Sequence, residues 1–378
     1  LSDKALEILS SVNLSVDVKT GLKAEELQNI IGEYDGVIVR SAAKITKDII
    51  AKGDKLKVIG RAGIGVDNVD VQAATEKGIV VMNTPQGNAL AAAKHSIGLM
   101  FAAARKIAIA DRTMKQGKWE KKALMGIEIY GKTLGVVGIG NIGIIVAEKA
   151  VALGMRVLAY DIFVSKEFAA SKGIELVSLD TLLKESDFIA IHVPLVKETR
   201  SLINKDAIGK MKKSAIIINV ARGPVVNEKD LFEALQEGRI AGAALDVFDE
   251  EPPPKDNPLV LSDKVVCTPH LGASTAEAQD KVAVDIANQI VDYFQSGVIK
   301  NSVNAPSFSI DVAKKIAPYL KLAENLGVIV SAITEFPIKE IQVQYMGDIA
   351  EMDTKILTQG IVKSILSNQL EGVNYVNA

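Results

Sequence analysis

The sequence predicts an α/β protein with two doubly wound parallel-sheet domains, followed by the start of a third domain of α+β type. Three observations support this prediction. Apolar strand-like runs alternate with helical patterns up to about residue 300. A strand, a glycine turn, a helix and a second strand follow one another in Thr133–Asp161. From about Asn304 the pattern changes to long helices with one alternating run. Regular alternation of strands and helices is typical of a parallel sheet with helices on both faces.

The first 84 residues alternate helix and strand. Strands are expected at Gly36–Val39, Lys57–Gly60 and Ile79–Met82. The opening segment is helical, whereas an α/β domain normally places a strand ahead of such a helix, so we expect the chain to be cut at this end and at its other end. Ligands of parallel sheets bind at the carboxyl ends of the strands. Arg40 and Arg61 follow two of these strands and are therefore candidate anion binders.

The glycine-rich stretch predicts a dinucleotide site in a Rossmann-like domain. The run Leu134–Val137 leads into Gly138, Gly140 and Gly143, and a helical pattern follows. In this pattern the first glycine makes a tight turn, the second lets the backbone approach a pyrophosphate, and the third lets the helix pack on the strand. Asp161 ends the next strand, 161 − 143 = 18 residues after the third glycine. A carboxylate there bonds ribose hydroxyls and repels a 2′-phosphate, which favours NAD over NADP. The alternative is a glycine turn in an unrelated α/β sheet.

The rest of the chain extends the same architecture. Six parallel strands are expected in the second domain, at 134–137, 157–160, 187–192, 215–219, 243–245 and 265–267. Asn88–Lys118 is expected to form one long helix that joins the two domains, and another long helix runs from about Thr275 to Gln295. Beyond residue 304 we expect helices at Val312–Ile333 and Met352–Leu366, with a half-buried strand at Ile338–Tyr345 between them.

Length, charge and cysteine content indicate which kinds of protein this chain can be. The chain has 378 residues, too many for one typical core, and its net charge of −2 favours neither nucleic acid nor a membrane surface. No run approaches the roughly 18 apolar residues of a membrane span, and no signal peptide is visible. With a single cysteine there is no internal disulfide framework. We therefore expect a soluble, cytoplasmic protein.

Three histidines are available for acid–base chemistry. His95 lies within the long helix, which favours a packed or surface role. His192 ends a strand beside the expected cofactor crevice, so packing against the cofactor is favoured over catalysis. His270 follows the last strand in a loop, where an imidazole with a pKa near neutrality is a suitable general acid or base. The residues alone leave catalysis by His270 and a structural role about equally open.

Hydride transfer from an alcohol carbon also needs a fixed cation and a group that controls the base. Arg222 can supply the cation, and Glu251 can hold His270 protonated by charge pairing. The alternatives are a helix-cap salt bridge for Arg222 and a solvated loop acid for Glu251. No cluster has metal-ligand spacing, so no metal site is expected. Cys267 lies in an apolar strand and is expected to be a buried structural thiol.

Four motifs occur in the order typical of one enzyme family. They are the stretch Gly138–Asp161, the sequence NVARG at 219–223, the sequence ALDVFDEEP at 244–252 and the sequence TPHLG at 268–272. Together they resemble the D-isomer-specific 2-hydroxyacid dehydrogenases over roughly residues 1–302. The resemblance implies a catalytic set of Arg222, Glu251 and His270, with NAD as the cofactor.

The resemblance also implies further site residues. Loops at 39–41, 60–68 and 83–88, together with the region after Asn304, resemble the family members that oxidise 3-phosphoglycerate at the start of L-serine biosynthesis. Substrate contacts are then implied for Arg40, Ser41, Asn88, Arg222 and His270, and for the backbone N–H groups of Ala62 and Gly63. The implied cofactor contacts are Gly138, Gly140, Asn141, Ile142, Gly143, Tyr160, Asp161, His192, Val193, Pro194, Thr199, Val220, Ala221, Arg222, Asp246, His270 and Gly272.

The same resemblance gives domain limits and partners. It implies a discontinuous substrate domain at 1–88 and 284–303, an NAD-binding domain at 89–283, and at 304–378 part of an intervening, regulatory-type domain without the serine-sensing ACT domain. A homo-oligomer is expected, as a dimer through residues 88–130 or a tetramer. Lys121 is a candidate contact to a neighbouring subunit's site, and Lys94 departs from the acid usual in the family.

Two other functions remain open at this point. One is a different D-2-hydroxyacid dehydrogenase, of the glyoxylate or hydroxypyruvate reductase type or the D-lactate type. The other is a non-catalytic NAD-sensing protein similar to the transcriptional corepressors of this fold. The third domain argues against the first alternative. The loops and the C-terminal region that resemble those of 3-phosphoglycerate enzymes argue against the second.

Overall fold

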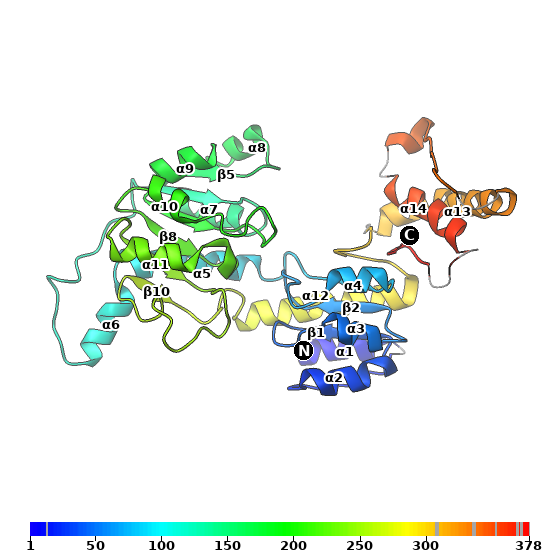
Figure 1. Ribbon diagram of the computed structural model, residues 1–378, viewed down its shortest axis with the longest axis horizontal. Coiled ribbons are helices and arrows are strands. Elements are labelled where there is room, and N and C mark those ends of the chain that lie inside the picture. The colour runs from blue at the N-terminus through cyan, green and yellow to red at the C-terminus, as the bar shows by residue number, and fades with distance from the viewer. Residues whose placement is uncertain are drawn as a thin grey trace. The chain divides into compact units, whose positions relative to one another are not determined.

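The computed structural model describes the chain except for residues 13, 307–309, 335–337, 352–353, 368–369, 371–372 and 378. The described residues form two compact units, one of Leu1–Gly87 with Gln279–Ala378 and one of Asn88–Ala278. Each unit has a parallel sheet flanked by helices (Figure 1), which confirms the predicted α/β class. The predicted limits of the substrate-binding, NAD-binding and intervening domains remain a prediction.

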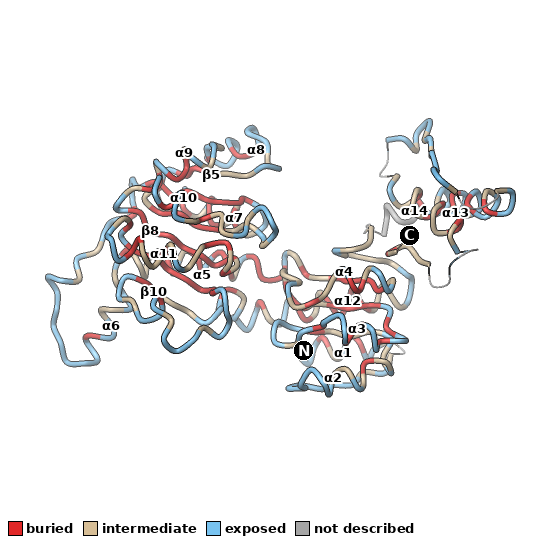
Figure 2. Tube along the Cα trace, viewed as in Figure 1, coloured by how far each residue is buried: buried red, intermediate tan, exposed pale blue. Residues whose placement is uncertain are grey.

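The first unit is built on a three-stranded parallel sheet. Its strands lie in the order β1 (Gly36–Val39), β2 (Val58–Arg61), β3 (Val80–Met82). Its helices are α1 (Asp3–Ser10), α2 (Ala24–Ile30), α3 (Lys47–Lys52), α4 (Val71–Glu76), most of α12 (Ala276–Ser296), α13 (Ile310–Ile333) and α14 (Lys355–Leu366). Side chains of α1 and α12 form one core cluster with the sheet, and side chains of α3 and α4 form a second. Buried residues concentrate in the strands and the helix faces on them (Figure 2).

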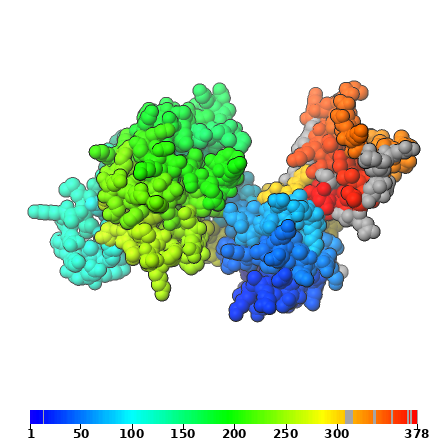
Figure 3. All heavy atoms as spheres, in the orientation of Figure 1, coloured from blue at the N-terminus to red at the C-terminus, as the bar shows by residue number. Residues whose placement is uncertain are grey.

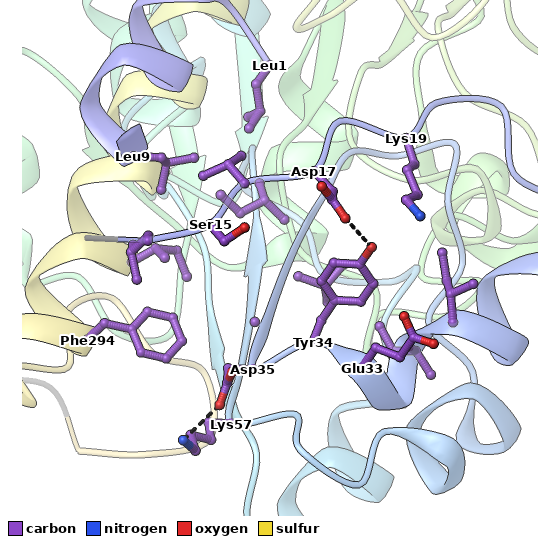
Figure 4. A pocket seen from close by; sticks show the side chains of 18 of the residues that line it. Leu1, Leu9, Ser15, Asp17, Lys19, Glu33, Tyr34, Asp35, Lys57 and Phe294 are labelled. Atoms are coloured by element: carbon purple, nitrogen blue, oxygen red, sulfur yellow. Dashed lines mark hydrogen bonds and ion pairs between the residues drawn. The ribbon is translucent and has the colours of Figure 1, made fainter. Parts of the chain in front are cut away.

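The outer edge of β1 borders a cavity of about 680 Å³. Its lining includes Leu14, Val16, Asp17 and residues 36–38 of β1, and Figure 4 shows Asp17 beside Tyr34 in this cavity. Asp17 accepts a hydrogen bond of 2.6 Å from the hydroxyl of Tyr34. Among the described strands β1 pairs with β2 alone, so its other edge faces this cavity.

The second unit has a seven-stranded parallel sheet in the order β10-β9-β8-β7-β4-β5-β6. The strands are β4 (Thr133–Val137), β5 (Arg156–Tyr160), β6 (Glu175–Leu176), β7 (Phe188–Ile191), β8 (Ile216–Asn219), β9 (Gly242–Leu245) and β10 (Val265–Cys267). The prediction of six strands missed the two-residue β6. The strand order reverses at β4, so the carboxyl end of β4 lies at a topological switch point, where ligands of such sheets bind.

Helices cover both faces of this sheet. They are α5 (Ala89–Ala104), α6 (Ile107–Lys115), α7 (Gly143–Ala152), α8 (Lys166–Ser171), α9 (Leu179–Glu185), α10 (Lys205–Lys210) and α11 (Glu228–Gln236). Two separate apolar clusters, one on each side of the strands, bury alternate residues such as Ile189 and Ala190. Because both faces are buried, the strands are apolar throughout, as in other parallel sheets.

The expectation of one long helix over Asn88–Lys118 was wrong. The chain forms α5 and then α6, with Lys106 between them in the left-handed conformation (φ 52°). The carbonyl of Ala104, the last residue of α5, accepts a hydrogen bond of 2.9 Å from the N–H of Ile127 in place of a bond from a following helical turn. Sequence propensity could not reveal a hydrogen bond from a segment more than twenty residues away.

The region after residue 304 contains the two predicted helices, α13 and α14, packed along each other around Ile316, Ala323 and Ile361. The first two residues of the expected helix at Met352–Leu366 lie outside the described residues. The expected strand at Ile338–Tyr345 was wrong, because the segment forms no strand. Its alternation has another cause: Ile338, Val343 and Tyr345 pack on the helix pair, and the Tyr345 hydroxyl lies 2.8 Å from Thr358 Oγ1.

One described helical segment, Lys315–Ile333 of α13, is long and apolar enough to cross a membrane by length and composition alone. This finding differs from the expectation that no stretch would approach a membrane span. Lys321 and Glu324 interrupt the apolar residues, so no continuous run is visible in the sequence. Core helices of water-soluble proteins meet the same criterion, and one face of this segment packs on α14.

Substitution of Gly143 tests the contact between α7 and the glycine turn. A Cβ at Gly143 would lie 1.9 Å from the carbonyl oxygen of Gly138, whereas a Cβ at Gly140 would meet nothing within 4 Å. We expect Gly143→Ala to destabilise the unit by about 2 kcal/mol or more and to lower Tm by roughly 5 °C, because backbone has to move. Gly140→Ala, in the same turn, is the matched control and should keep the wild-type Tm in thermal unfolding. Equal Tm values for the two variants would contradict the packing role.

Candidate active site

The three glycines of the turn after β4 have different surroundings. Gly138 has φ 88°, a conformation that favours glycine, and a Cβ there would lie 2.8 Å from Val193 Cγ1. Gly140 is open on the side where a Cβ would project, so a ligand can approach its backbone closely. Gly143 begins α7 and touches the Gly138 carbonyl. The N-terminal end of α7 adds the partial positive charge of the helix dipole, which suits an anionic ligand.

Asp161 lies at the end of β5, next to this turn. Its Oδ2 accepts the N–H of Ile139 at 2.9 Å, and its Oδ1 accepts the N–H of Phe163 at 2.8 Å. The carboxylate therefore holds the glycine turn as well as its own loop. An ionised carboxylate has about four lone-pair sites, so two backbone bonds leave acceptor capacity for hydroxyl groups of a ligand.

His192 follows β7 on the other side of β4. Burial lowers the pKa of its imidazole to about 4, so the ring is neutral near pH 7. Its Nε2 lies 3.5 Å from Ser96 Oγ, and its Nδ1 is buried with no hydrogen-bond partner among the described residues. Val193 and Pro194 follow His192 and form a wall beside the glycine turn with it. The Thr199 hydroxyl stabilises this wall by donating to the Pro194 carbonyl at 2.6 Å.

The turn after β8 is fixed by the strand's last residue. The Asn219 side chain accepts the N–H of Ala221 at 3.0 Å and donates to the carbonyl of Arg222 at 2.9 Å. Gly223 lies so close to Phe248 that a Cβ there would be 2.0 Å from its carbonyl carbon and oxygen. Val220 and Ala221 are buried, and Arg222 is placed at the carboxyl edge of the sheet.

His270 and Glu251 form an ion-pair contact in the loops after β9 and β10. Nδ1 of His270 lies 2.7 Å from Oε2 of Glu251, and the N–H of Phe248 donates to the other oxygen at 3.2 Å. Burial acts to raise the pKa of Glu251, but the hydrogen bond and charge of His270 outweigh it, with help from Arg222, and the pKa lies below its ordinary value. The structure therefore brings Arg222, Glu251 and His270 into one electrostatic group.

His270 lies in a turn that a buried acid holds from behind. We call residues 268–272 the His270 turn. His270 itself is left-handed (φ 53°), and Asp246 accepts the next two N–H groups, from Leu271 at 2.7 Å and Gly272 at 2.8 Å. Oδ1 of Asp246 also lies 3.1 Å from His95 Nε2. Sequence reasoning missed the role of His95, because no local signal connects residues 151 positions apart.

The predicted substrate contacts of the first unit lie in two loops. Arg40 and Ser41 follow β1 in a loop where the Asn68 side chain donates to the carbonyl of Arg40 at 2.9 Å. Ala62 and Gly63 follow β2. Gly63 has φ 145°, a backbone conformation that residues with a Cβ rarely adopt, so glycine is favoured there. The N–H of Thr84 donates to the Gly63 carbonyl at 3.0 Å and anchors this loop.

Five further positions singled out in the sequence lie in the second unit. Asn88 precedes α5 in the second unit, and its Oδ1 is buried without a hydrogen-bond partner in the described part of the chain. The Cys267 thiol is half-buried rather than fully buried, and burial raises its pKa to about 11. Asn141, Ile142 and Tyr160 line the glycine turn and the end of β5. The described residues contain no group of three or more His, Cys, Asp or Glu side chains that could hold a metal ion.

Two family models match the chain. Residues 97–272 match the model described as "D-isomer specific 2-hydroxyacid dehydrogenase, NAD binding domain". Residues 315–378 match the model described as "D-3-phosphoglycerate dehydrogenase intervening domain". The first match covers most of the second unit, including the glycine turn and the His270 turn.

Curated proteins named D-3-phosphoglycerate dehydrogenase are similar over nearly the whole chain. The one from Methanocaldococcus jannaschii is 47% identical over 380 residues, covering 100% of this chain and 72% of that protein. The one from Synechocystis is 49% identical over 375 residues, covering 99% and 67%. Among solved structures, D-lactate dehydrogenase from Aquifex aeolicus, complexed with NAD and lactic acid, is 32% identical with a TM-score of 0.70, covering 80% of this chain and 95% of that one.

The buried imidazole of His192 predicts an acid-sensitive stability. Its pKa is about 4 in the folded chain and about 6.5 when exposed, so between these values the unfolded chain binds more protons. Stability from the neutral ring is therefore fully present above pH 6.5 and is lost as the pH falls towards 4, by up to about 3 kcal/mol. In urea unfolding at pH 7 and pH 4.5, His192→Leu should lose less stability than the wild type.

Ser96→Ala is the matched control for this measurement. It removes the hydroxyl beside His192 but leaves the ring buried, so its stability should fall with acid as in the wild type. If His192→Leu and the wild type lose the same stability between the two pH values, the ring is not the source of the acid sensitivity.

Proposed function

The chain belongs to the D-3-phosphoglycerate dehydrogenase family, and we propose that it oxidises 3-phospho-D-glycerate to 3-phosphohydroxypyruvate with NAD. This reaction is the first step of the phosphorylated route to L-serine. The single observation that supports the catalytic assignment is the 2.7 Å contact between His270 Nδ1 and Glu251 Oε2. A carboxylate only accepts, so Nδ1 is the ring's protonated nitrogen, and Nε2 is left to take a proton from substrate.

The proposed mechanism gives each residue of the set one task. Nε2 of His270 removes the proton of the C2 hydroxyl while the C2–H bond breaks and the C2=O bond forms. Glu251 orients the imidazole through Nδ1 and stabilises its protonated form by its negative charge. Arg222 binds the substrate carboxylate and the C2 oxygen, and its fixed positive charge polarises the developing carbonyl.

The residues around the glycine turn fit NAD. Open space at Gly140 and the N-terminus of α7 suit a pyrophosphate, and Asp161 retains capacity to accept ribose hydroxyls. The neutral His192 and the wall that continues from it, Val193 and Pro194, suit the flat apolar faces of the bases. When bound, NAD supplies the acceptor for the hydrogen and electron pair that leave C2. The remaining cofactor contacts implied by resemblance lie at the carboxyl edge of the same sheet. Asp246 is the exception to a direct contact, because it is completely buried and its oxygens already accept backbone N–H groups of the His270 turn.

The substrate contacts are proposed from chemistry. 3-Phosphoglycerate carries a carboxylate and a phosphate, which require cations and N–H donors. Arg40 and Ser41 supply a guanidinium and a hydroxyl, and the loop of Ala62 and Gly63 supplies backbone N–H groups. Asn88 offers a buried, unpaired side-chain oxygen that can accept a substrate hydroxyl. We assign the first unit to substrate and the second to NAD on this basis.

We further propose a homodimer formed through α6 and the loop that leads from it to β4. This segment projects from the second unit (cyan in Figure 3). Its exposed apolar side chains are Ile107, Met114, Trp119, Met125, Ile127 and Tyr130. Trp119 is 79% exposed, and several large exposed apolar side chains in one segment are typical of an interaction surface. We also propose a cytoplasmic location.

Turnover of three substrates tests the proposed function. NADH formation should be fastest with 3-phosphoglycerate and slower with glycerate and D-lactate, because only the first presents a phosphate to Arg40. His270→Ala should lower kcat by about 100- to 10,000-fold, the usual contribution of a general base. Equal turnover of the three acids would overturn the substrate assignment, and wild-type kcat in His270→Ala would overturn the mechanism.

Light scattering on a sizing column tests the dimer. Trp119→Lys together with Met125→Lys places two charges on the proposed interface and should convert the dimer to monomers at micromolar concentration. Leu261→Lys is the matched control, because Leu261 is also exposed in the second unit but lies outside this segment. A wild-type monomer, or a dimer that survives both lysines, contradicts the assignment of this surface.

A further inference from the structure

We propose that His95 on α5 is a positioning residue for the reaction: it orients the buried carboxylate that holds the backbone of the His270 turn. The inference rests on the proposed function, because it assigns His95 a purpose only if His270 is the base. His95 touches neither the substrate nor the cofactor in this proposal. It acts through Asp246, and Asp246 acts through two backbone N–H groups.

Sheet register brings the members of this group together. β9 and β10 are parallel neighbours with Leu245 opposite Cys267, so the next residues, Asp246 and Thr268, leave the sheet side by side. The Thr268 hydroxyl donates to Asp246 Oδ1 at 2.5 Å. The His270 turn therefore begins at a residue that is already bonded to the carboxylate.

Asp246 is completely buried, with 0% of the residue exposed. Its two oxygens accept from four groups, namely Thr268, Leu271, Gly272 and His95. Both oxygens can serve backbone N–H groups only while the carboxylate is ionised, since a protonated carboxyl would point an O–H at one of them. Buried ionised carboxylates need hydrogen bonds and opposite charge to remain so.

His95 supplies one of these hydrogen bonds. Nε2 lies 3.1 Å from Asp246 Oδ1 and 3.1 Å from Thr268 Oγ1, and because the carboxylate can only accept, Nε2 carries a hydrogen. Burial acts to raise the pKa of Asp246, and the hydrogen bond from His95 is foremost among the interactions that bring this pKa below its ordinary value. Among the described residues, His95 is the side chain that forms an ion-pair contact with Asp246.

The position of His95 on α5 extends the connection. Asn88, a proposed substrate contact, directly precedes this helix, and His95 follows it by seven residues, about two helical turns. α5 also packs on β8 and β9, whose carboxyl ends hold Arg222 and Asp246. A single rigid helix thus fixes the distance between a substrate contact and the anchor of the base.

Two substitutions separate a donor role from mere space filling. His95→Leu fills most of the volume without a donor, whereas His95→Gln can place an amide N–H near the position of Nε2. We expect His95→Leu to lower kcat at least tenfold with the KM for NAD within twofold of wild type, and His95→Gln to recover most of the loss. Lys94→Gln, at the exposed neighbouring residue, is the matched control and should behave as wild type.

Hydrogen exchange measures the anchor directly. In His95→Leu the amide hydrogens of Leu271 and Gly272 should exchange at least tenfold faster, while those of the buried strands β4 and β8 keep their wild-type rates. His95→Gln should restore slow exchange at the two amides. Faster exchange throughout the second unit would instead show general destabilisation and would overturn the specific role.

A double-mutant cycle tests whether His95 and Thr268 act through the same oxygen. Thr268→Val removes the other side-chain donor to Asp246 Oδ1. If both act through that oxygen, the combined variant should lose a factor in kcat that differs from the product of the two single losses. A simple product would contradict the shared route, and unchanged kcat in His95→Leu would overturn the proposal. If the wild type fails to oxidise 3-phosphoglycerate, the exchange measurements still decide whether His95 anchors the turn.

Discussion

Both oxygens of the Asp246 carboxylate lie buried behind the turn that presents His270, and each accepts a backbone N–H from that turn. A side chain on a loop is normally free to move, whereas a base must hold its geometry to within a fraction of an ångström. The carboxylate resolves this conflict by fixing the backbone on the sheet side, while Glu251 fixes the imidazole on the loop side. The proposed catalytic set depends on a charge that is completely buried.

The parallel sheet explains why such a charge can exist here. β8, β9 and β10 end at one edge, so Asn219, Asp246 and Thr268 emerge next to each other and bond the turns that follow them. Each of these polar side chains is the first group beyond an apolar strand. The fold therefore builds the proposed site from positions that the sequence pattern predicts as strand ends.

The alternating pattern and the motifs predicted the fold class, the cofactor and the family. What they could not predict depended on contacts between distant residues. The break between α5 and α6 arises from Ile127 bonding the end of a helix. The alternation at 338–345 reflects packing on two helices and not a sheet. A packed or surface role was expected for His95 because its partner Asp246 lies far along the chain. The loops at 60–68 and 83–88 were recognised by resemblance, but the sequence did not show the hydrogen bonds by which Asn68 and Thr84 anchor the loops of Arg40 and Gly63.

The single cysteine has a practical consequence. Cys267 ends β10, immediately before Thr268, and its half-buried thiol has a pKa near 11. Only the thiolate reacts quickly with alkylating reagents, so the native chain should label slowly at neutral pH. Any loosening of the strand end beside Thr268 would expose the sulfur and lower its pKa. The rate at which this single thiol is alkylated therefore reports how often the end of β10 opens beside the His270 turn.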